Sequence, residues 1–248
     1  MLYIQWKKAS KLISRAVFVF VLILISSASD AQKVLFQEEH DLKPYYFGIT
    51  LGVNKAKFHT HLDPSFINQD SIMVAEPKNS GGFSLGLLAT LRLSNRFEFR
   101  FNPQLMFTER DLYYKLNTTH PGDIDFGHDI TKKVESVITT LPFHFKFRSD
   151  RIGNFRVYLL GGGKFDIDLA SNAKARQAED MVRIQRFDYG IEAGMGFNFY
   201  FPSFILSPEI KFSNGFSNLH DRNEALKYSR VFEGIQSRMI MFTIHLEG

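Results

Sequence analysis

Charged side chains recur at every second position within several apolar segments, and these are the residues of the chain that could do chemistry. The segment from Phe97 to Phe107 shows the pattern, because Glu98 and Arg100 lie between phenylalanines. A period of two places alternate side chains on opposite faces of a β-strand, so the charged residues share one face. The residues that this pattern assigns to the charged face are Arg92, Glu98, Arg100, His144, Lys146, Arg156, Lys164, Asp166, Glu192, Glu209 and Lys211.

Two uses of this charged face can be considered. Charges of both signs within a narrow interior should pair with one another, because an unpaired buried charge is strongly destabilising. We therefore predict that these residues form a structural set of ion pairs. A proton or ion path along the same face is the alternative, and it is the less favoured of the two.

A short histidine motif could in principle ligate a metal. His59, His61 and Asp63 supply imidazole and carboxylate groups, which are ordinary metal ligands. They lie in a long polar segment without an evident further ligand, so we interpret them as part of a solvated loop. No metal site and no cofactor is predicted.

A glycine run, Gly161–Lys164, invites comparison with phosphate-binding loops but departs from their pattern. Tyr158 stands where the first glycine belongs, and Phe165 replaces the serine or threonine. Glycines at this place more simply relieve crowding in a strand. No serine, histidine and acid come together at one strand end either, so we assign no catalytic residue and predict neither an enzyme nor a small-molecule substrate.

The elements that position these residues are eight predicted strands joined by connections of alternating length. Short connections are expected at 94–95, 148–154 and 202–203, and long polar ones at 57–80, 110–132, 170–186 and 214–233. Short periplasmic turns and long outer loops are typical of outer-membrane barrels. We therefore predict an all-β, eight-stranded antiparallel transmembrane β-barrel with both mature termini in the periplasm. Its strands are expected at 45–54, 83–93, 96–109, 137–147, 155–168, 188–200, 204–212 and 240–246.

The two faces of these strands differ sharply in composition. The chain contains 26 phenylalanines, and they concentrate on the face opposite the charges. This favours a lipid-facing apolar exterior and a charged interior. A lipocalin-like cup with the same strand number would turn the apolar face inward instead. The glycine-rich, charge-bearing face fits a filled interior better than a solvated exterior.

Three prolines fall inside the predicted strands, at Pro103, Pro142 and Pro208. Proline cannot donate a backbone hydrogen bond to a β-ladder. We expect each of them to mark a bulge rather than to end a strand.

Residues 1–31 have the organisation of a secretory signal peptide. Four basic residues precede a ten-residue apolar core at 16–25, which is short for a membrane span. Ser29 and Ala31 are small residues suited to cleavage after Ala31, which leaves 32–248 as the barrel domain. An uncleaved anchor is the alternative.

The charge balance of the mature chain is nearly neutral. The 30 basic and 26 acidic residues become 26 and 25 once the four basic residues and Asp30 of the signal are removed, a net charge of +1. This gives no case for nucleic-acid binding. The chain has no cysteine, which excludes disulfides and a lipoprotein anchor.

Three segments together resemble a known family. They are Phe47–Asn54, Gly82–Phe101 and Leu141–Phe147, in that order and spacing. They are similar to PorT, the outer-membrane β-barrel protein of the type IX secretion and gliding-motility machinery of Bacteroidetes. The resemblance extends over nearly the whole mature chain.

The resemblance implies a non-enzymatic role in exporting cargo proteins that carry a C-terminal signal domain. It implies outer-membrane lipid and other proteins of the secretion machinery as partners, and it carries over no catalytic residues. A lipid-modifying enzyme, or a surface binding or adhesion protein, is the alternative for a small barrel of this kind.

Overall fold

The computed structural model describes residues 34–64, 72–116, 129–171, 184–221, 228–229 and 231–248. The chain divides into two units, Met1–Leu35 and Phe36–Gly248, and the second unit holds the barrel. The predicted signal peptide, 1–31, lies outside the described residues, so cleavage after Ala31 stays a prediction. No helix in the described ranges has the length and hydrophobicity needed to cross a membrane.

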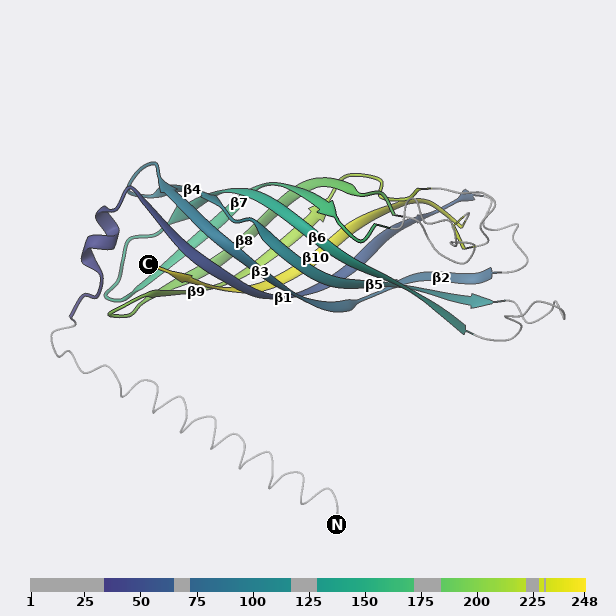
Figure 1. Cartoon of the computed structure of the whole chain (residues 1–248), viewed down its shortest axis with the longest axis horizontal. Coiled ribbons are helices and arrows are strands. Elements are labelled where there is room, and N and C mark those ends of the chain that lie inside the picture. The colour runs from purple at the N-terminus through teal and green to yellow at the C-terminus, as the bar shows by residue number, and fades with distance from the viewer. Residues whose placement is uncertain (1–33, 65–71, 117–128, 172–183, 222–227, 230) are drawn as a thin grey trace, which may run out of the picture. The chain divides into compact units, whose positions relative to one another are not determined.

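The described residues form one short 3-10 helix and ten strands in a single antiparallel sheet (Figure 1). The helix, η1, spans Glu38–Leu42. The strands are β1 (Tyr45–Leu62), β2 (Ile72–Lys78), β3 (Ser80–Arg92), β4 (Phe97–Phe101), β5 (Gln104–Leu116), β6 (Asp129–Arg148), β7 (Phe155–Asp168), β8 (Phe187–Tyr200), β9 (Ile205–Gly215) and β10 (Phe232–Glu247).

These strands build an eight-stranded barrel, as predicted. Only Asn79 separates β2 from β3, and only Asn102 and Pro103 separate β4 from β5, so each pair acts as one long strand. The sheet closes because β1 pairs with β10 on one side and with β3 on the other. Closure removes the unpaired strand edges along the shared length of the barrel.

The alternation of short and long connections is also present. The three short connections are 93–96, 149–154 and 201–204, and all lie at one end of the barrel. Gly153 has a φ of 60° within the second of them, a left-handed conformation that glycine adopts without strain.

Several strands continue further than the sequence pattern predicts. β1 reaches Leu62 and β2 begins at Ile72, within the predicted connection 57–80. β5 ends at Leu116 and β6 begins at Asp129, within the predicted connection 110–132. Beyond the apolar belt the outer face of these strands carries polar residues, and the inner face carries apolar ones such as Phe58, Leu112 and Tyr114. The apolar side of the alternation therefore changes from the outer to the inner face while the backbone pairing continues.

The predicted bulges at Pro103, Pro142 and Pro208 are wrong. The partners of β4 and β5 on β3 and β6 follow one continuous register across the break at Pro103. Pro142 pairs with Lys164, and Pro208 pairs with Ile244, without a register shift. Each proline removes one N–H donor from the ladder, and the paired neighbours on both sides keep the strand in register.

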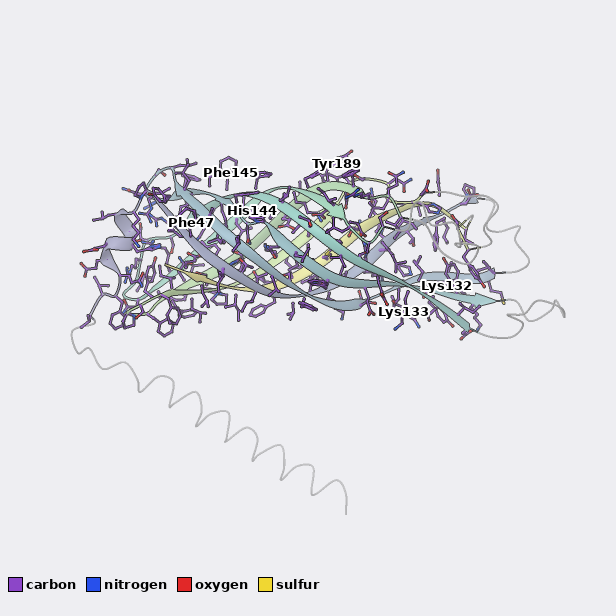
Figure 2. The ribbon with its side chains drawn as sticks, in the orientation of Figure 1. Phe47, Lys132, Lys133, His144, Phe145 and Tyr189 are labelled. Carbon is purple, nitrogen blue, oxygen red and sulfur yellow. The ribbon has the colours of Figure 1, made fainter. Side chains whose placement is uncertain are left out.

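The two faces of the barrel wall are opposite in character, as predicted. Phe47 and Phe145 project outward with 62% and 59% of their surface exposed, whereas His144 points inward and is fully buried (Figure 2). The charged face therefore lines the interior and the aromatic face is external. This arrangement excludes the lipocalin-like alternative, in which the faces are reversed.

The interior changes in polarity along the barrel. Charged and polar side chains fill it from the short-turn end through most of its length. Towards the long-connection end, the interior is filled by an apolar cluster whose large members include Phe58, Tyr114, Tyr228 and Phe232. The charged part of the interior is thus closed off from that end by packed apolar side chains.

Candidate functional site

The interior charges form the candidate site of this chain, and we call them the interior charge network. The structure places all eleven residues predicted from the sequence on the interior face. Ten of them are buried, and the side chain of Arg92 is 9% exposed. They come from β3, β4 and β6 to β9, because the alternation of each strand directs them to the same enclosed space.

The network begins near the short-turn end at Glu98. Its carboxylate accepts a hydrogen bond of 2.9 Å from the hydroxyl of Tyr46. It also lies 3.0 Å from Arg148 and 3.4 Å from Lys146. A single buried carboxylate thus balances two cations from the neighbouring strand β6, and Arg92 adds a third at 3.6 Å.

Arg100 occupies the centre of the barrel with no exposed surface. One terminal nitrogen donates to Glu209 at 2.8 Å, and the other donates to Glu247 at 2.9 Å. Tyr158 donates its hydroxyl to Glu209 at 2.8 Å. Arg100 therefore ties β4 to β9 and β10, on the opposite wall of the barrel.

Two further groups extend the network along the axis. His144 lies 2.9 Å from Glu192, and Lys211 bridges Glu192 and Glu209 at 3.9 and 3.5 Å. Further along, Lys164 pairs with Asp166 at 2.5 Å.

Close backbone approach allows the large side chains to fit. A Cβ atom on Gly196 would lie 2.4 Å from the ring of Tyr158, so this glycine makes the space that Tyr158 occupies. A Cβ on Gly162 would lie 1.9 Å from the carbonyl oxygen of Phe143. The glycine run around Gly162 therefore serves packing in strand β7, and not a phosphate loop.

Sequence reasoning missed several members of the network. Arg110, Arg148 and Glu247 are buried inside, and Arg110 pairs with Asp168 at 3.3 Å. The alternation of the sequence could have identified them, since each lies two residues beyond another inward-facing residue of its strand. The sequence pattern places Arg110 and Arg148 in connections, because the apolar face ends beside them. Glu247 follows His245 by two residues and so lies on the same inward face.

Asp41 had no periodic signal at all, because it lies on helix η1 before the first strand. Its carboxylate lies 2.7 Å from Arg156, 3.3 Å from Arg151 and 3.5 Å from Arg148. Arg92 donates hydrogen bonds to the backbone oxygens of this helix. The helix is thereby fastened across the short-turn end, and we call η1 with these contacts the cap.

Burial and ion pairing act in opposite directions on the pKa of Asp41. Burial raises it, but the hydrogen bond and charge of Arg156, with the charge of Arg148, outweigh burial and lower the pKa from its ordinary value. The neighbouring His40 is buried against the ring of Tyr46. Burial lowers the pKa of His40 from 6.5 to about 4. The docked cap thus contains an anionic Asp41 and a neutral His40 at neutral pH.

The cap should loosen in mild acid. Docked His40 binds fewer protons than undocked His40 between pH 6.5 and about 4, so lowering the pH through this window favours the undocked form. The stabilisation from Asp41 is lost only at lower pH, because its pKa is depressed. A spin label on Leu42→Cys, in a chain without other cysteines, should gain mobility over the window. The gain in spin-label mobility on acidification should be much smaller in a His40→Gln background. An equal gain in that background would contradict the assignment to His40.

The histidine motif is not a loop, contrary to the prediction. His59 and His61 lie within strand β1, and their rings are 4.8 Å apart on the outer side of the barrel. Across the described ranges, no three histidine, aspartate or glutamate side chains are grouped closely enough to hold a metal ion.

The arrangement is chemically suited to holding the barrel wall together from within. The cations and carboxylates of the interior charge network occupy the lumen and neutralise one another. Eight strands enclose an interior just wide enough for such side chains. The exterior, in contrast, carries a belt of aromatic and aliphatic residues suited to lipid.

Comparison with protein families agrees with this geometry. A family model described as "Outer membrane protein beta-barrel domain" matches residues 31–221. The chain belongs to this family. It is therefore an outer-membrane β-barrel protein, and its apolar belt faces the lipid of that membrane.

Several solved structures resemble the chain at low sequence identity. Ail of Yersinia pestis is 14% identical, with 83% of this chain and 100% of that chain covered and a TM-score of 0.40. OprG of Pseudomonas aeruginosa is 12% identical, with coverage of 82% and 93% and a TM-score of 0.44. Neisserial surface protein A is 13% identical, with coverage of 81% and 96% and a TM-score of 0.38. No curated protein matches the chain.

Proposed function

We propose that this barrel is a non-enzymatic docking component of an outer-membrane protein secretion machinery, of the type IX kind. The resemblance of its strand segments to the PorT family supports this role. The observation that carries the docking mechanism is the filled interior, in which Arg100 joins opposite walls through Glu209 and Glu247. A folded cargo protein cannot pass through such a barrel, so the chain must act beside the translocation pore and not as the pore.

The short-turn end is the proposed docking surface. We place it, with the cap and the C-terminus, on the periplasmic side, following the usual arrangement of short turns in outer-membrane barrels. Leu42 on the cap and Ile152 in the second turn are 83% and 79% exposed, outside the apolar belt. Exposed apolar side chains rimmed by charges suit contact with another protein of the machinery.

Deletion of the gene tests the proposal through the location of the cargo. Proteins with the C-terminal signal domain should accumulate unprocessed in the periplasm, while other outer-membrane proteins assemble normally. Wild-type chain should restore export, and a Leu42→Asp/Ile152→Asp variant should insert into the membrane yet restore it poorly. Normal surface delivery of cargo in the deletion strain would contradict the secretion role.

A role at the cell surface is the second candidate, and one observation favours it. Strands β1, β5 and β6 continue past the apolar belt and carry polar residues on their outer side, such as His61, Lys115 and Lys133. This projecting sheet could present a binding or adhesion surface. Intact cargo export together with lost surface binding in the deletion strain would favour this candidate.

A further inference from the structure

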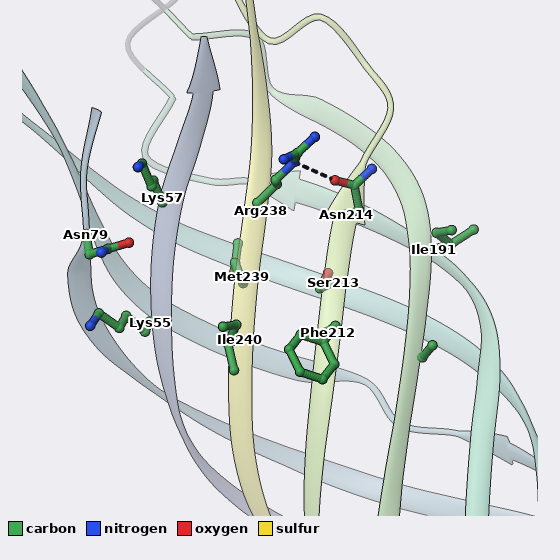
Figure 3. Close-up of a pocket in the computed structure, with 11 residues that line it drawn as sticks. Lys55, Lys57, Asn79, Ile191, Phe212, Ser213, Asn214, Arg238, Met239 and Ile240 are labelled. Atoms are coloured by element: carbon green, nitrogen blue, oxygen red, sulfur yellow. Dashed lines mark hydrogen bonds between the residues drawn. The ribbon is translucent and has the colours of Figure 1, made fainter. Parts of the chain in front are cut away.

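The outer wall of the barrel contains a hollow that the docking role does not use. Its volume is about 590 Å³, and it lies over strands β1, β10, β9 and β8 (Figure 3). Phe212 and Ile240 lie among its apolar lining, and Lys55, Lys57 and Arg238 supply its charges. The lining thus combines an apolar wall with three cations.

The hollow lies where the apolar belt ends. On β1, the outward residues Tyr45 to Val53 are all apolar, and the next two outward residues are Lys55 and Lys57. On β10, Ile240 is followed in the same direction by Arg238. We therefore expect lipid chains to contact the apolar wall on the short-turn side of the cations, and we expect the cations to lie at the level of the lipid headgroups.

The register brings the cations together. Lys57 is the direct partner of Arg238 in the β1–β10 ladder, and Lys55 is the partner of Ile240. Directly opposite side chains have Cβ atoms about 5 Å apart, and residues two apart on one strand are about 6.6 Å apart. The Cβ atoms of the three residues are thus close enough for their flexible side chains to reach one charged headgroup, although Arg238 is directed towards Asn214 in Figure 3.

Nothing in the hollow neutralises these charges. Its lining contains no acidic residue, and within the described ranges none of the three cations forms an ion pair. Among the described residues, the side chain of Arg238 donates a hydrogen bond to the amide oxygen of Asn214, at 3.0 Å. Like charges placed directly opposite in a sheet are destabilising, so the Lys57–Arg238 pair costs stability unless an anion lies between the two side chains.

We infer that this hollow binds a membrane lipid whose headgroup carries more than one phosphate. The phosphates would accept hydrogen bonds from Lys55, Lys57 and Arg238, and an acyl chain would lie against Phe212 and Ile240. Guanidinium and ammonium groups are the usual hydrogen-bond donors to phosphate oxygens, and these hydrogen bonds are strengthened by the opposite charges. The inference is independent of the proposed secretion role.

Nanodiscs that contain a small fraction of diphosphoryl lipid A test the inference, with native mass spectrometry of the released barrel as the readout. Wild-type chain should retain the lipid, and the triple variant K55Q/K57Q/R238Q should lose on the order of tenfold or more in apparent affinity. The matched control is K115Q/K133Q. These lysines also lie on the outer side of strands, but each faces an acid across the β5–β6 ladder, Asp129 and Asp111. The control should bind as the wild type does.

A second variant separates binding from folding. Lys57→Glu replaces a like-charge pair by an opposite-charge pair with Arg238, so it should raise resistance to unfolding in lipid-free detergent while it weakens lipid binding. Equal lipid retention by wild type and triple variant would overturn the inference. Equal retention of singly charged phosphatidylglycerol, or displacement by inorganic phosphate at matched concentration, would overturn the requirement for a multiply phosphorylated lipid.

Discussion

Replacement of Arg100 by leucine should destabilise the barrel by about 3–5 kcal/mol, the cost of breaking a buried ion pair by removing one partner. Leucine leaves Glu209 and Glu247 without their central cation, in an interior where all three residues are buried. Lys211 and His245 remain near Glu209, at 3.5 and 3.4 Å, and continue to compensate its charge. Most of the destabilisation should therefore come from Glu247, which loses its ion pair with Arg100. Denaturant unfolding in lipid vesicles measures the change in the free energy of unfolding.

The barrel provides a matched control for this experiment. Arg96 pairs with Asp150 at 3.1 Å near the short turns, and the two side chains are 58% and 83% exposed. Exposed pairs contribute about 0–1 kcal/mol, so Arg96→Leu should change stability little. Similar losses in the two variants would contradict a special role for the buried pairs. Adding Glu247→Leu to Arg100→Leu should recover part of the loss, because it removes the stranded charge.

A charge on the lipid face should have the second-largest effect. Phe101 projects from β4 within the apolar belt and stacks on Phe143 of β6, with ring centroids 4.9 Å apart. Phe101→Arg should destabilise the barrel by about 2–4 kcal/mol, the cost of arginine near the bilayer midplane. The unfolding free energy in vesicles again gives the measurement.

The control for Phe101 lies outside the membrane. Ile152→Arg changes an apolar residue in the 149–154 turn, where a charge costs about 0–1 kcal/mol.

Cysteines placed at positions 99 and 101 should also react more slowly with a soluble thiol reagent than one at position 115, near the end of β5. Fast labelling at 99 and 101 would show that this face is not covered by lipid.

The barrel and most of its charged interior were predictable because one physical rule governs both. In a membrane strand one face contacts lipid and the other contacts the barrel interior. The alternation of Phe97, Glu98 and Phe99 therefore shows which side chains point outward as well as that the segment is a strand. The same rule assigns inward positions without knowledge of contacts. It cannot tell which cation meets which carboxylate, because those partners lie on strands far apart in the sequence.

Other features were unpredictable for identifiable reasons. The far ends of β1, β5 and β6 carry polar residues outside and apolar residues inside, so the pattern of a lipid-facing strand does not continue along them. Asp41 belongs to a helix of five residues with no apolar period, and three arginines from distant segments hold it in place. The three prolines each remove a hydrogen-bond donor without displacing a residue, because the neighbouring ladder bonds preserve the register.

The central arginine also has a consequence for how the chain reaches its final form. Arg100 meets Glu209 and Glu247, which are separated from it by 109 and 147 residues along the chain. The pair with Glu209 needs strand β9, and the pair with Glu247 cannot form until the last strand, β10, has arrived. Closure between β1 and β10 depends on that same late strand. Contacts of such sequence separation form slowly, since a long loop must close before they are made. The central ion pairs are therefore complete only when the barrel has closed, so a chain that lacks β10 would remain an open sheet with Arg100 unpaired on that side.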